Sequence, residues 1–140
     1  MKVENAPASF TFNSYNIGQF SFIEPKTEQK EIFVDFAPSG MYSQKDGTFT
    51  MVFIFIATFG EDTREKIIDL AMKGIFKFEP NTPKENIPEY FYQNSIAIIY
   101  PYVRAFVSTL TSLATAKPLI LPTLNLSSLG ENLKANTQYN

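Results

Sequence analysis

The sequence predicts an α+β fold, in which helices cover one face of an antiparallel β-sheet. Four segments with alternating apolar residues come first, and the helical pattern begins only after residue 88. Strands grouped before helices are typical of this class, whereas alternating strands and helices would predict a parallel sheet. With 44% hydrophobic and 19% charged residues, the chain is expected to form one domain over 1–140. Residues 1–8 are expected to be a loose end, and residues 130–140 a helix end and tail.

The first strand is predicted over Phe10–Phe22, and its alternation is interrupted. Its phenylalanines occupy even positions, whereas Tyr15 and Ile17 occupy odd ones. One inserted residue reverses the facing of every residue after it, so we expect a β-bulge near Ser14–Gly18.

Three further strands are predicted, over residues 32–40, 48–59 and 68–78. The Asp-Gly pair in Lys45-Asp46-Gly47 suits a hairpin turn between the second and third strands. In Thr48–Phe59, phenylalanine and methionine fill one face, which we expect to meet the helix. The fourth strand alternates apolar residues with Asp69, Lys73 and Lys77.

A short helix is predicted over Pro88–Asn94, followed by a long one from Ser95. The long helix repeats apolar residues at helical spacing, namely Ile96, Ile99, Val103, Phe106, Leu110 and Leu113. Beside them runs a seam of small or polar residues, Ala97, Arg104, Ser108, Thr111, Ser112 and Thr115. Arg104 is the only charge of this helix, although a helix on a monomer surface normally carries a charged stripe. We therefore expect the seam to meet a second subunit.

The loop Lys117–Leu126 contains two prolines and several large aliphatic residues. Proline excludes a regular helix interior, and loops usually lie on the surface. The segment is therefore either a lid on the core or an exposed binding surface. Because Leu119 and Leu121 flank one residue in a stiffened segment, we expect them to point the same way, toward solvent.

These segments resemble the SecB family of export chaperones, which hold preproteins unfolded. The resemblance rests on Pro101-Tyr102-Val103-Arg104 and on Pro118-x-x-Leu121-Pro122-x-Leu124-Asn125-Leu126-x-x-Leu129. Weaker matches occur in order before them, at Phe20-Ser21-Phe22, Asp35-Phe36-Ala37-Pro38, Phe59-Gly60-Glu61-Asp62-Thr63 and Gly74-Ile75-Phe76. Val103 replaces the usual alanine, and Leu126 replaces the usual phenylalanine. The resemblance implies a four-stranded sheet with a long helix and a short carboxy-terminal helix, assembled as a dimer of dimers.

Composition argues against most catalytic functions. The chain has neither His nor Cys, which removes the usual nucleophile–base pairs and zinc ligands. The adjacent Glu61 and Asp62 fit a solvated turn better than a carboxylate pair. A net charge of −2 offers no basic surface for nucleic acid, and no glycine-rich phosphate loop occurs. We expect no enzyme activity, cofactor or metal. No segment approaches the roughly 20 apolar residues of a membrane span, so a cytoplasmic protein is expected.

Apolar surface is therefore the remaining functional candidate. The expected groove for unfolded clients comprises Phe36, Met41, Tyr42, Tyr90, Tyr92, Leu119, Leu121, Leu124 and Leu126. Leu129 and Phe78 are expected in the core. The clients would be preproteins or, as in some SecB-like chaperones, an antitoxin. The resemblance also implies contact with the SecA motor through acids; Asp69 is in place, whereas Gln19 and Ile23 stand where acids are expected. The alternative is a binder of a lipid-like ligand gripped between helix and sheet.

Overall fold

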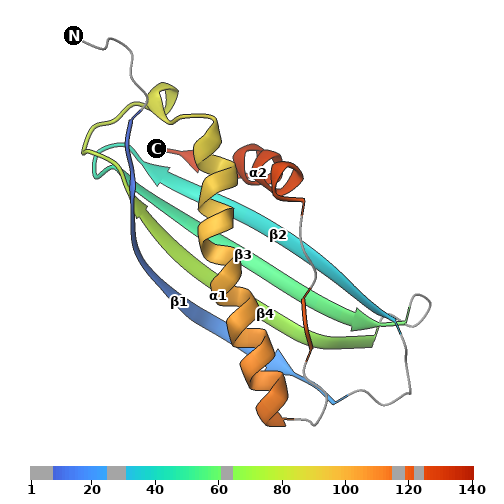
Figure 1. Cartoon of the computed structure of the whole chain (residues 1–140). Helices are drawn as coiled ribbons and strands as arrows, with labels where there is room; N and C mark the ends of the chain where they lie inside the picture. Colours follow the sequence, from blue (N-terminus) through green and yellow to red (C-terminus); the bar gives the residue numbers. More distant parts are fainter. Residues whose placement is uncertain (1–7, 25–30, 61–64, 115–118, 122–124) are drawn as a thin grey trace.

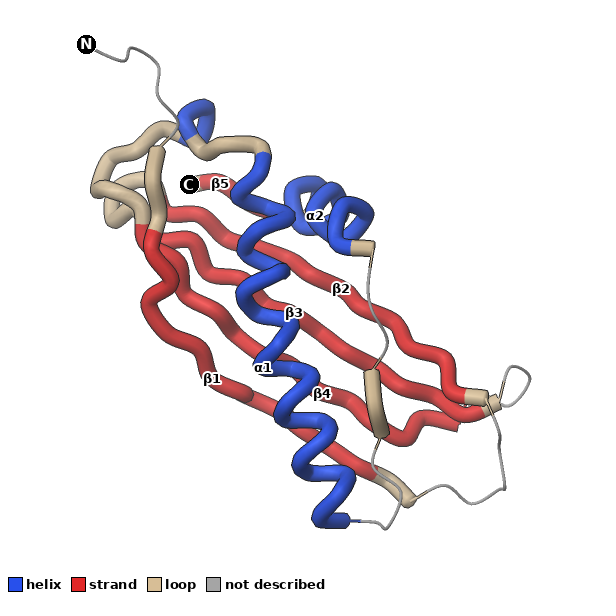
Figure 2. Tube along the Cα trace, viewed as in Figure 1, coloured by secondary structure: helices blue, strands red, loops and turns tan. Residues whose placement is uncertain are grey.

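The computed structural model describes residues 8–24, 31–60, 65–114, 119–121 and 125–140, arranged in two layers (Figure 1). One layer is a sheet with the strand order β1-β4-β3-β2-β5. Its strands are β1 (Thr11–Phe22), β2 (Ile32–Ser43), β3 (Thr48–Phe59), β4 (Glu65–Lys77) and β5 (Thr137–Tyr139). The other layer holds α1 (Tyr90–Ala114) and α2 (Leu126–Ala135), preceded by the short helix η1 (Lys84–Asn86). The predicted α+β fold with both helices on one face is confirmed (Figure 2).

The sheet has five strands in the described part of the chain, where the sequence predicted four. Strand β5 pairs in parallel with β2, from Gly40 to Tyr42. It falls within the residues expected to be a helix end and tail. The backbone N–H of Asn136 donates to Asn132 O at 3.0 Å and ends α2, after which the chain turns onto the free edge of β2.

Strand β1 has two irregularities in its pairing with β4. The register shifts between Phe12 and Ser14, and again between Ile17 and Gln19. Each shift reverses the facing of the subsequent residues, so Tyr15 and Ile17 lie on the same face as the phenylalanines on either side. The predicted bulge is confirmed, and the second one restores the original alternation.

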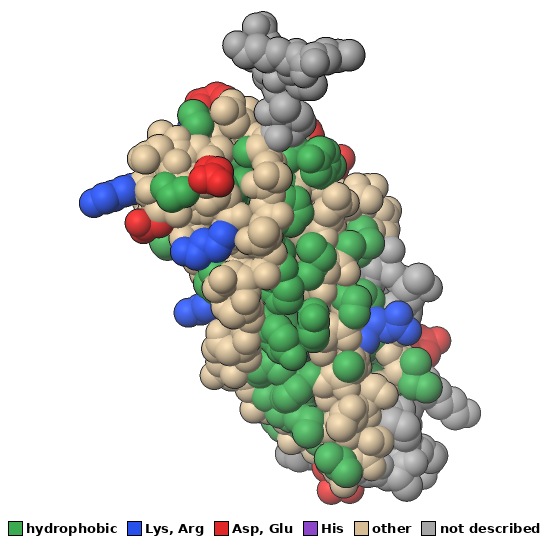
Figure 3. Space-filling model, turned by 60° about the vertical axis from the view of Figure 1, so that its left-hand side comes forward, with side chains coloured by type: hydrophobic (Ala, Val, Ile, Leu, Met, Phe, Trp, Pro, Cys, Tyr) green, Lys and Arg blue, Asp and Glu red, His purple; other side chains and the backbone are tan. Residues whose placement is uncertain are grey.

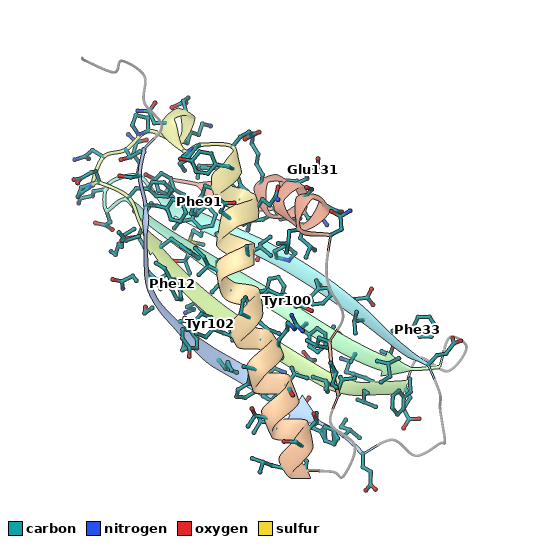
Figure 4. All side chains as sticks on the ribbon, viewed as in Figure 1. Phe12, Phe33, Phe91, Tyr100, Tyr102 and Glu131 are labelled. Carbon is teal, nitrogen blue, oxygen red and sulfur yellow. The ribbon has the colours of Figure 1, made fainter. Side chains whose placement is uncertain are left out.

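The core lies between the helices and the phenylalanine-rich face of the sheet. In β3, Phe49, Phe53 and Phe55 have no exposed side-chain surface, as their alternation predicted. At one end of α1, Phe91 points down onto the sheet (Figure 4). Its ring centroid lies 4.8–5.6 Å from those of five other rings, Phe10, Phe49, Phe76, Phe78 and Tyr92. The expected core positions of Phe78 and Leu129 are confirmed.

Helix α1 is one continuous helix, not the predicted pair, and it includes Pro101 on its exposed side. Ile96, Ile99 and Val103 are buried against the sheet, as predicted. Leu113 is 78% exposed, so the prediction that it continues the apolar face is wrong. The last turn of α1 reaches beyond the edge of the sheet (Figure 1), so the sheet does not bury this end of the helix.

By length and composition, α1 passes the test for a membrane-crossing helix, contrary to the expectation from the sequence. The core helices of water-soluble proteins pass the same test. One side of α1 is buried on its own sheet, which accounts for much of its apolar character.

The expected loose amino terminus falls mostly on residues 1–7, which lie outside the described part of the structure. Ala8, the first described residue, donates its backbone N–H to Asn86 O at 3.2 Å. This hydrogen bond joins the chain before β1 to the short helix η1 before α1.

Gly74 on β4 permits the close approach of α1, because a Cβ there would lie 2.6 Å from Cδ1 of Ile99. We expect Gly74→Ala to lower the free energy of unfolding by about 1–3 kcal/mol, measured by urea denaturation. Ile99→Val removes the clashing methyl, so the double variant should lose less than the sum of the single losses. Gly18→Ala is the control, since a Cβ at Gly18 meets nothing within 4 Å. Equal losses for the two glycine variants would contradict this explanation.

Candidate functional site

Residues 119–121, the described part of the segment between α1 and α2, lie beside α1 (Figure 1). These residues alternate in facing: Leu121 is 3% exposed and Leu119 half-buried, whereas Ile120 between them is 75% exposed. Leu119 and Leu121 do point the same way, but inward. The expectation that these two leucines face solvent is therefore wrong, and Ile120 is the outward residue.

A buried threonine fixes this alternation. Thr111 is 1% exposed, and its Oγ1 accepts a hydrogen bond from the backbone N–H of Leu119 at 2.8 Å. The same hydroxyl donates to Val107 O at 2.7 Å. Because the amide of Leu119 is tied to the inner side of α1, its side chain and that of Leu121 lie over the core.

A hollow of about 340 Å³ opens between the flank of α1 and this segment. We call it the flank groove; it is lined by Pro101, Arg104, Ala105, Ser108, Ile120 and Leu121. Arg104 is exposed, and its guanidinium carbon lies 5.8 Å from the centroid of the Tyr100 ring. The groove is thus an apolar surface with a single cation at its side.

The predicted small-polar seam of α1 therefore faces mainly the chain's own connecting segment. Arg104 and Ser108 line the flank groove, and Thr111 is buried beneath it, which corrects its expected place at a subunit surface. Ser112 is exposed, and its hydroxyl donates to Thr109 O at 2.7 Å. Thr115 lies outside the described residues.

Phe36 lies on the helix-facing side of β2 and contacts Tyr100 of α1. Its half-buried ring contacts Phe53, Phe55 and Tyr100, with centroid distances of 5.3–5.8 Å. Leu126, at the start of α2, is also half-buried. Leu124 lies outside the described residues. Of the predicted groove, Phe36 and Leu126 thus have partly accessible positions on the helix-facing side.

Tyr42 and Tyr92 belong to the core, which corrects their predicted place in an exposed groove. The hydroxyl of Tyr42 donates to Thr82 O at 2.6 Å. The hydroxyl of Tyr92 shares a hydrogen bond of 2.7 Å with that of Tyr139 in β5. Internal partners satisfy both phenols, which is why these polar groups tolerate burial.

Burial raises the pKa of Tyr42, Tyr92 and Tyr100 above the ordinary value for tyrosine. For Tyr92 the hydrogen bond with Tyr139 raises the pKa further, whereas for Tyr100 the charge of Arg104 opposes the rise. All three phenols therefore stay neutral at physiological pH, and none supplies a negative charge to Arg104.

Met41 and Tyr90 are exposed, but the structure does not bring them into the flank groove. Met41 alternates with the inward Tyr42 on β2, so it lies on the opposite face of the sheet. Tyr90 begins α1, far along the helix from Arg104. Both were predicted as groove residues from their apolar character and their place in the chain, which do not reveal the face that a side chain occupies.

A second apolar surface, which the sequence analysis missed, lies between β1 and α1. Tyr15 and Tyr102 are both exposed, and their ring centroids lie 4.3 Å apart. Figure 4 shows Tyr102 and Phe12 on the β1 side of α1, with Tyr100 on the other side. With this side of the molecule forward, Figure 3 shows hydrophobic side chains in a stripe along its length. The interrupted alternation of β1 could have predicted this surface, because the bulge between Phe12 and Ser14 turns Tyr15 toward α1.

On the uncovered face of the sheet, Asp35 of β2 and Asp69 of β4 lie on either side of Ile56 of β3. Asp69 is half-buried and pairs with Lys66 at 3.2 Å. Gln19, opposite Ala71 of β4, is exposed, as is Ile23 after β1. Within the described ranges, no cluster of three His, Cys, Asp or Glu could hold a metal ion.

The sequence profile described as preprotein translocase subunit SecB matches residues 8–136 of this chain. The protein-export protein SecB of Azoarcus sp. (strain BH72) is 28% identical over 86 residues, or 61% of this chain. An uncharacterized protein of Methanocaldococcus jannaschii, MJ0357, is 43% identical over 47 residues, or 34% of this chain. These matches span 56% and 30% of the two relatives' own lengths.

Two solved structures share the fold. The SecB-like chaperone Rv1957 of Mycobacterium tuberculosis, in complex with a ChAD peptide from the antitoxin HigA1, has a TM-score of 0.66 at 15% identity. The alignment covers 83% of this chain and 88% of that one. A protein of unknown function from Streptococcus agalactiae has a TM-score of 0.50 at 12% identity, covering 84% of this chain and all of that one.

The inward and outward residues of the connecting segment should differ sharply in their effect on stability. We expect Leu121→Ala to lower the free energy of unfolding by about 2–4 kcal/mol, because it removes a buried side chain. Ile120→Ala should change it by less than about 0.5 kcal/mol. Thermal or urea denaturation of both variants measures this. If Ile120→Ala proved the more damaging, the facing of the segment would be the reverse of that described.

Proposed function

The chain belongs to the SecB family, and we propose that it is a cytoplasmic chaperone that holds unfolded polypeptides in a soluble state. Its activity on this proposal is binding and not catalysis. The observation that carries the proposal is apolar surface left open to solvent, with Ile120 at the flank groove and Tyr15 and Tyr102 on the β1–α1 stripe. Contiguous apolar patches on a soluble protein usually mark binding sites.

Such surfaces suit clients of many sequences. Burial of a large apolar side chain contributes roughly 1.5–3 kcal/mol, whatever its neighbours in the client sequence. Each surface here is small, so useful affinity requires several side chains of one client to bind at once. Phe36 and Leu126, both half-buried, would offer further apolar contact area to a client.

Two kinds of client fit this family. Preproteins are favoured by the SecB family itself, and an antitoxin segment is favoured by the peptide-bound Rv1957 structure. For export, the partner would be the SecA motor, with Asp69 as contact. Lys66 pairs with Asp69, and Gln19 and Ile23 are neutral where the resemblance leads one to expect acids, which weakens the case for that contact. A SecA-independent holding role is therefore the stronger proposal.

The alternative function, a binder of a lipid-like ligand gripped between helix and sheet, receives less support. At the Phe91 end of α1, ring centroids from helix and sheet lie 4.8–5.6 Å apart, which fills the space such a ligand would need. The flank groove lies outside that interface, on the exposed side of α1.

We also propose a homotetramer, a dimer of dimers that meets through α1. The outermost side of α1 carries Ala105, Thr109 and Ser112, all exposed and uncharged. Small residues of this kind allow two helices to approach closely. Arg104 and Ser108, on the flank, border this contact surface.

Ile120→Ser should weaken the suppression of aggregation of an unfolded client, because it removes the most exposed apolar side chain of the groove. We expect about a threefold to tenfold weaker Kd, in line with partial burial of one aliphatic side chain. Fluorescence anisotropy with labelled unfolded fragments of increasing length measures the affinity. Affinity should rise with fragment length. If the shortest fragment bound as tightly as a whole unfolded protein, a discrete pocket would replace the chaperone proposal.

Ser112→Glu should shift the assembly from tetramers toward dimers, since like charges would face each other near a symmetry axis. Sedimentation velocity and light scattering measure the species. Gln19→Glu adds the same charge on the opposite face of the sheet and should leave the assembly unchanged. A wild-type protein that sediments as a monomer at micromolar concentration would refute the tetramer.

A further inference from the structure

We propose that the outer edge of β2 from Gly40 to Gln44 is a second binding site for extended client segments, and that β5 fills this site when no client is bound. A client strand with an aromatic side chain displaces β5 and pairs with β2 in its place. The inference rests on the holding function proposed above and names a further site through which that function would act.

Strand β5 lies on β2 in the way that an added peptide strand lies on the edge of a sheet (Figure 2). Its three residues pair in parallel with β2 from Gly40 to Tyr42. The backbone N–H of Gly40 donates to Asn136 O at 3.1 Å. The backbone N–H of Gln44 donates to Asn140 O at 3.2 Å. Because these bonds involve only main-chain groups, the edge can hold a strand of another sequence.

The side chains of β5 alternate as those of a peptide bound along a sheet edge do. Thr137 and Tyr139 are half-buried, whereas Gln138 between them is exposed. Thr137 lies close to β2 because Gly40 has no side chain, and a Cβ there would lie 2.8 Å from Thr137 Oγ1. The site therefore accepts a small side chain and, two positions later, a large one.

The groups around Tyr139 would serve an aromatic side chain of a client equally well. The centroid of its ring lies 6.4 Å from that of Tyr42 and 5.4 Å from Nζ of Lys84. Its hydroxyl shares a hydrogen bond of 2.7 Å with that of Tyr92. A client tyrosine can form all three contacts, and a client phenylalanine can form the two ring contacts. The chemistry of the site thus favours an extended segment with an aromatic residue.

Strand β5 is also the part of the sheet that should open most readily. It has 3 residues, whereas β2 has 12 and β4 has 13. It lies at the end of the strand order and pairs with β2 on one side. Short segments with few contacts open locally at a lower free-energy cost than central strands. A long client that also contacts the flank groove would offset the loss of the β5 pairing.

The test locks β5 in place with a disulfide, which is feasible because the chain has no cysteine. Met41→Cys and Gln138→Cys change two register partners whose side chains are both exposed. The probes are two labelled, unstructured apolar peptides that differ only by Tyr or Ser two positions after a central threonine. Oxidation of the double variant should weaken binding of the Tyr peptide about threefold to tenfold in anisotropy titrations, and reduction should restore it. Binding of the Ser peptide should change little.

Tyr139→Ala tests the same inference in the opposite direction. Loss of the ring loosens β5 and raises the fraction of molecules with an open site, so the Tyr peptide should bind about threefold to tenfold more tightly. The Ser peptide should not gain. If this variant melted at a lower temperature without tighter binding of the Tyr peptide, β5 would serve stability alone and the inference would be wrong.

The remaining outcomes separate this site from the holding function. Met41→Cys alone, treated with the same oxidant, is the control and should bind both peptides as the wild-type chain does. Equal binding of the Tyr peptide by the oxidised and reduced double variant would overturn the inference and leave the holding function intact. Equal weakening of both peptides on oxidation would show distortion by the disulfide and would also overturn it. If the wild-type chain bound neither peptide, the holding function would fall as well.

Discussion

The packing of α1 onto the aromatic face of the sheet is the interaction on which the rest of this structure depends. Phe91 enters a cluster of rings from β1, β3 and β4, and Gly74 leaves space for Ile99 further along the helix. These contacts fix the rotation of α1 about its axis. Once the rotation is fixed, Thr111 faces inward, Arg104 faces the flank, and Ser112 faces solvent. The functional surfaces are therefore consequences of core packing.

Periodicity was enough to predict the layers of this fold. The alternation of phenylalanines in β3 and the helical spacing of Ile96, Ile99 and Val103 each place one face in the core, and both placements are confirmed. The interrupted alternation of β1 also predicted a bulge correctly, because side-chain parity in a strand is unambiguous. Strand β5 was not predictable in this way, since three residues contain too little pattern to tell a strand from a helix end.

The candidate site was predicted less well, for a physical reason. The sequence marked Leu119 and Leu121 as a pair on one side of a stiff segment, but local rules do not say which side faces the core. A tertiary hydrogen bond from Leu119 N–H to Thr111 decides it, and that bond joins residues eight positions apart across the end of a helix. Similarly, Tyr42 combines an apolar ring with a polar hydroxyl. The hydrogen bond from this hydroxyl to Thr82 O makes its burial favourable.

The position of Ile120 follows from the same hydrogen bond and connects the fold with the proposed function. A loop closing a core must turn some side chains inward, and in an extended segment the residue between them turns outward. Leu119 and Leu121 face inward against α1, so Ile120 is held out at the flank groove by residues that face the core. A preformed apolar contact of this kind loses little conformational entropy on binding. On the proposed function, stability and binding would reside in neighbouring residues of one segment, so that Ile120 could vary without loss of the fold.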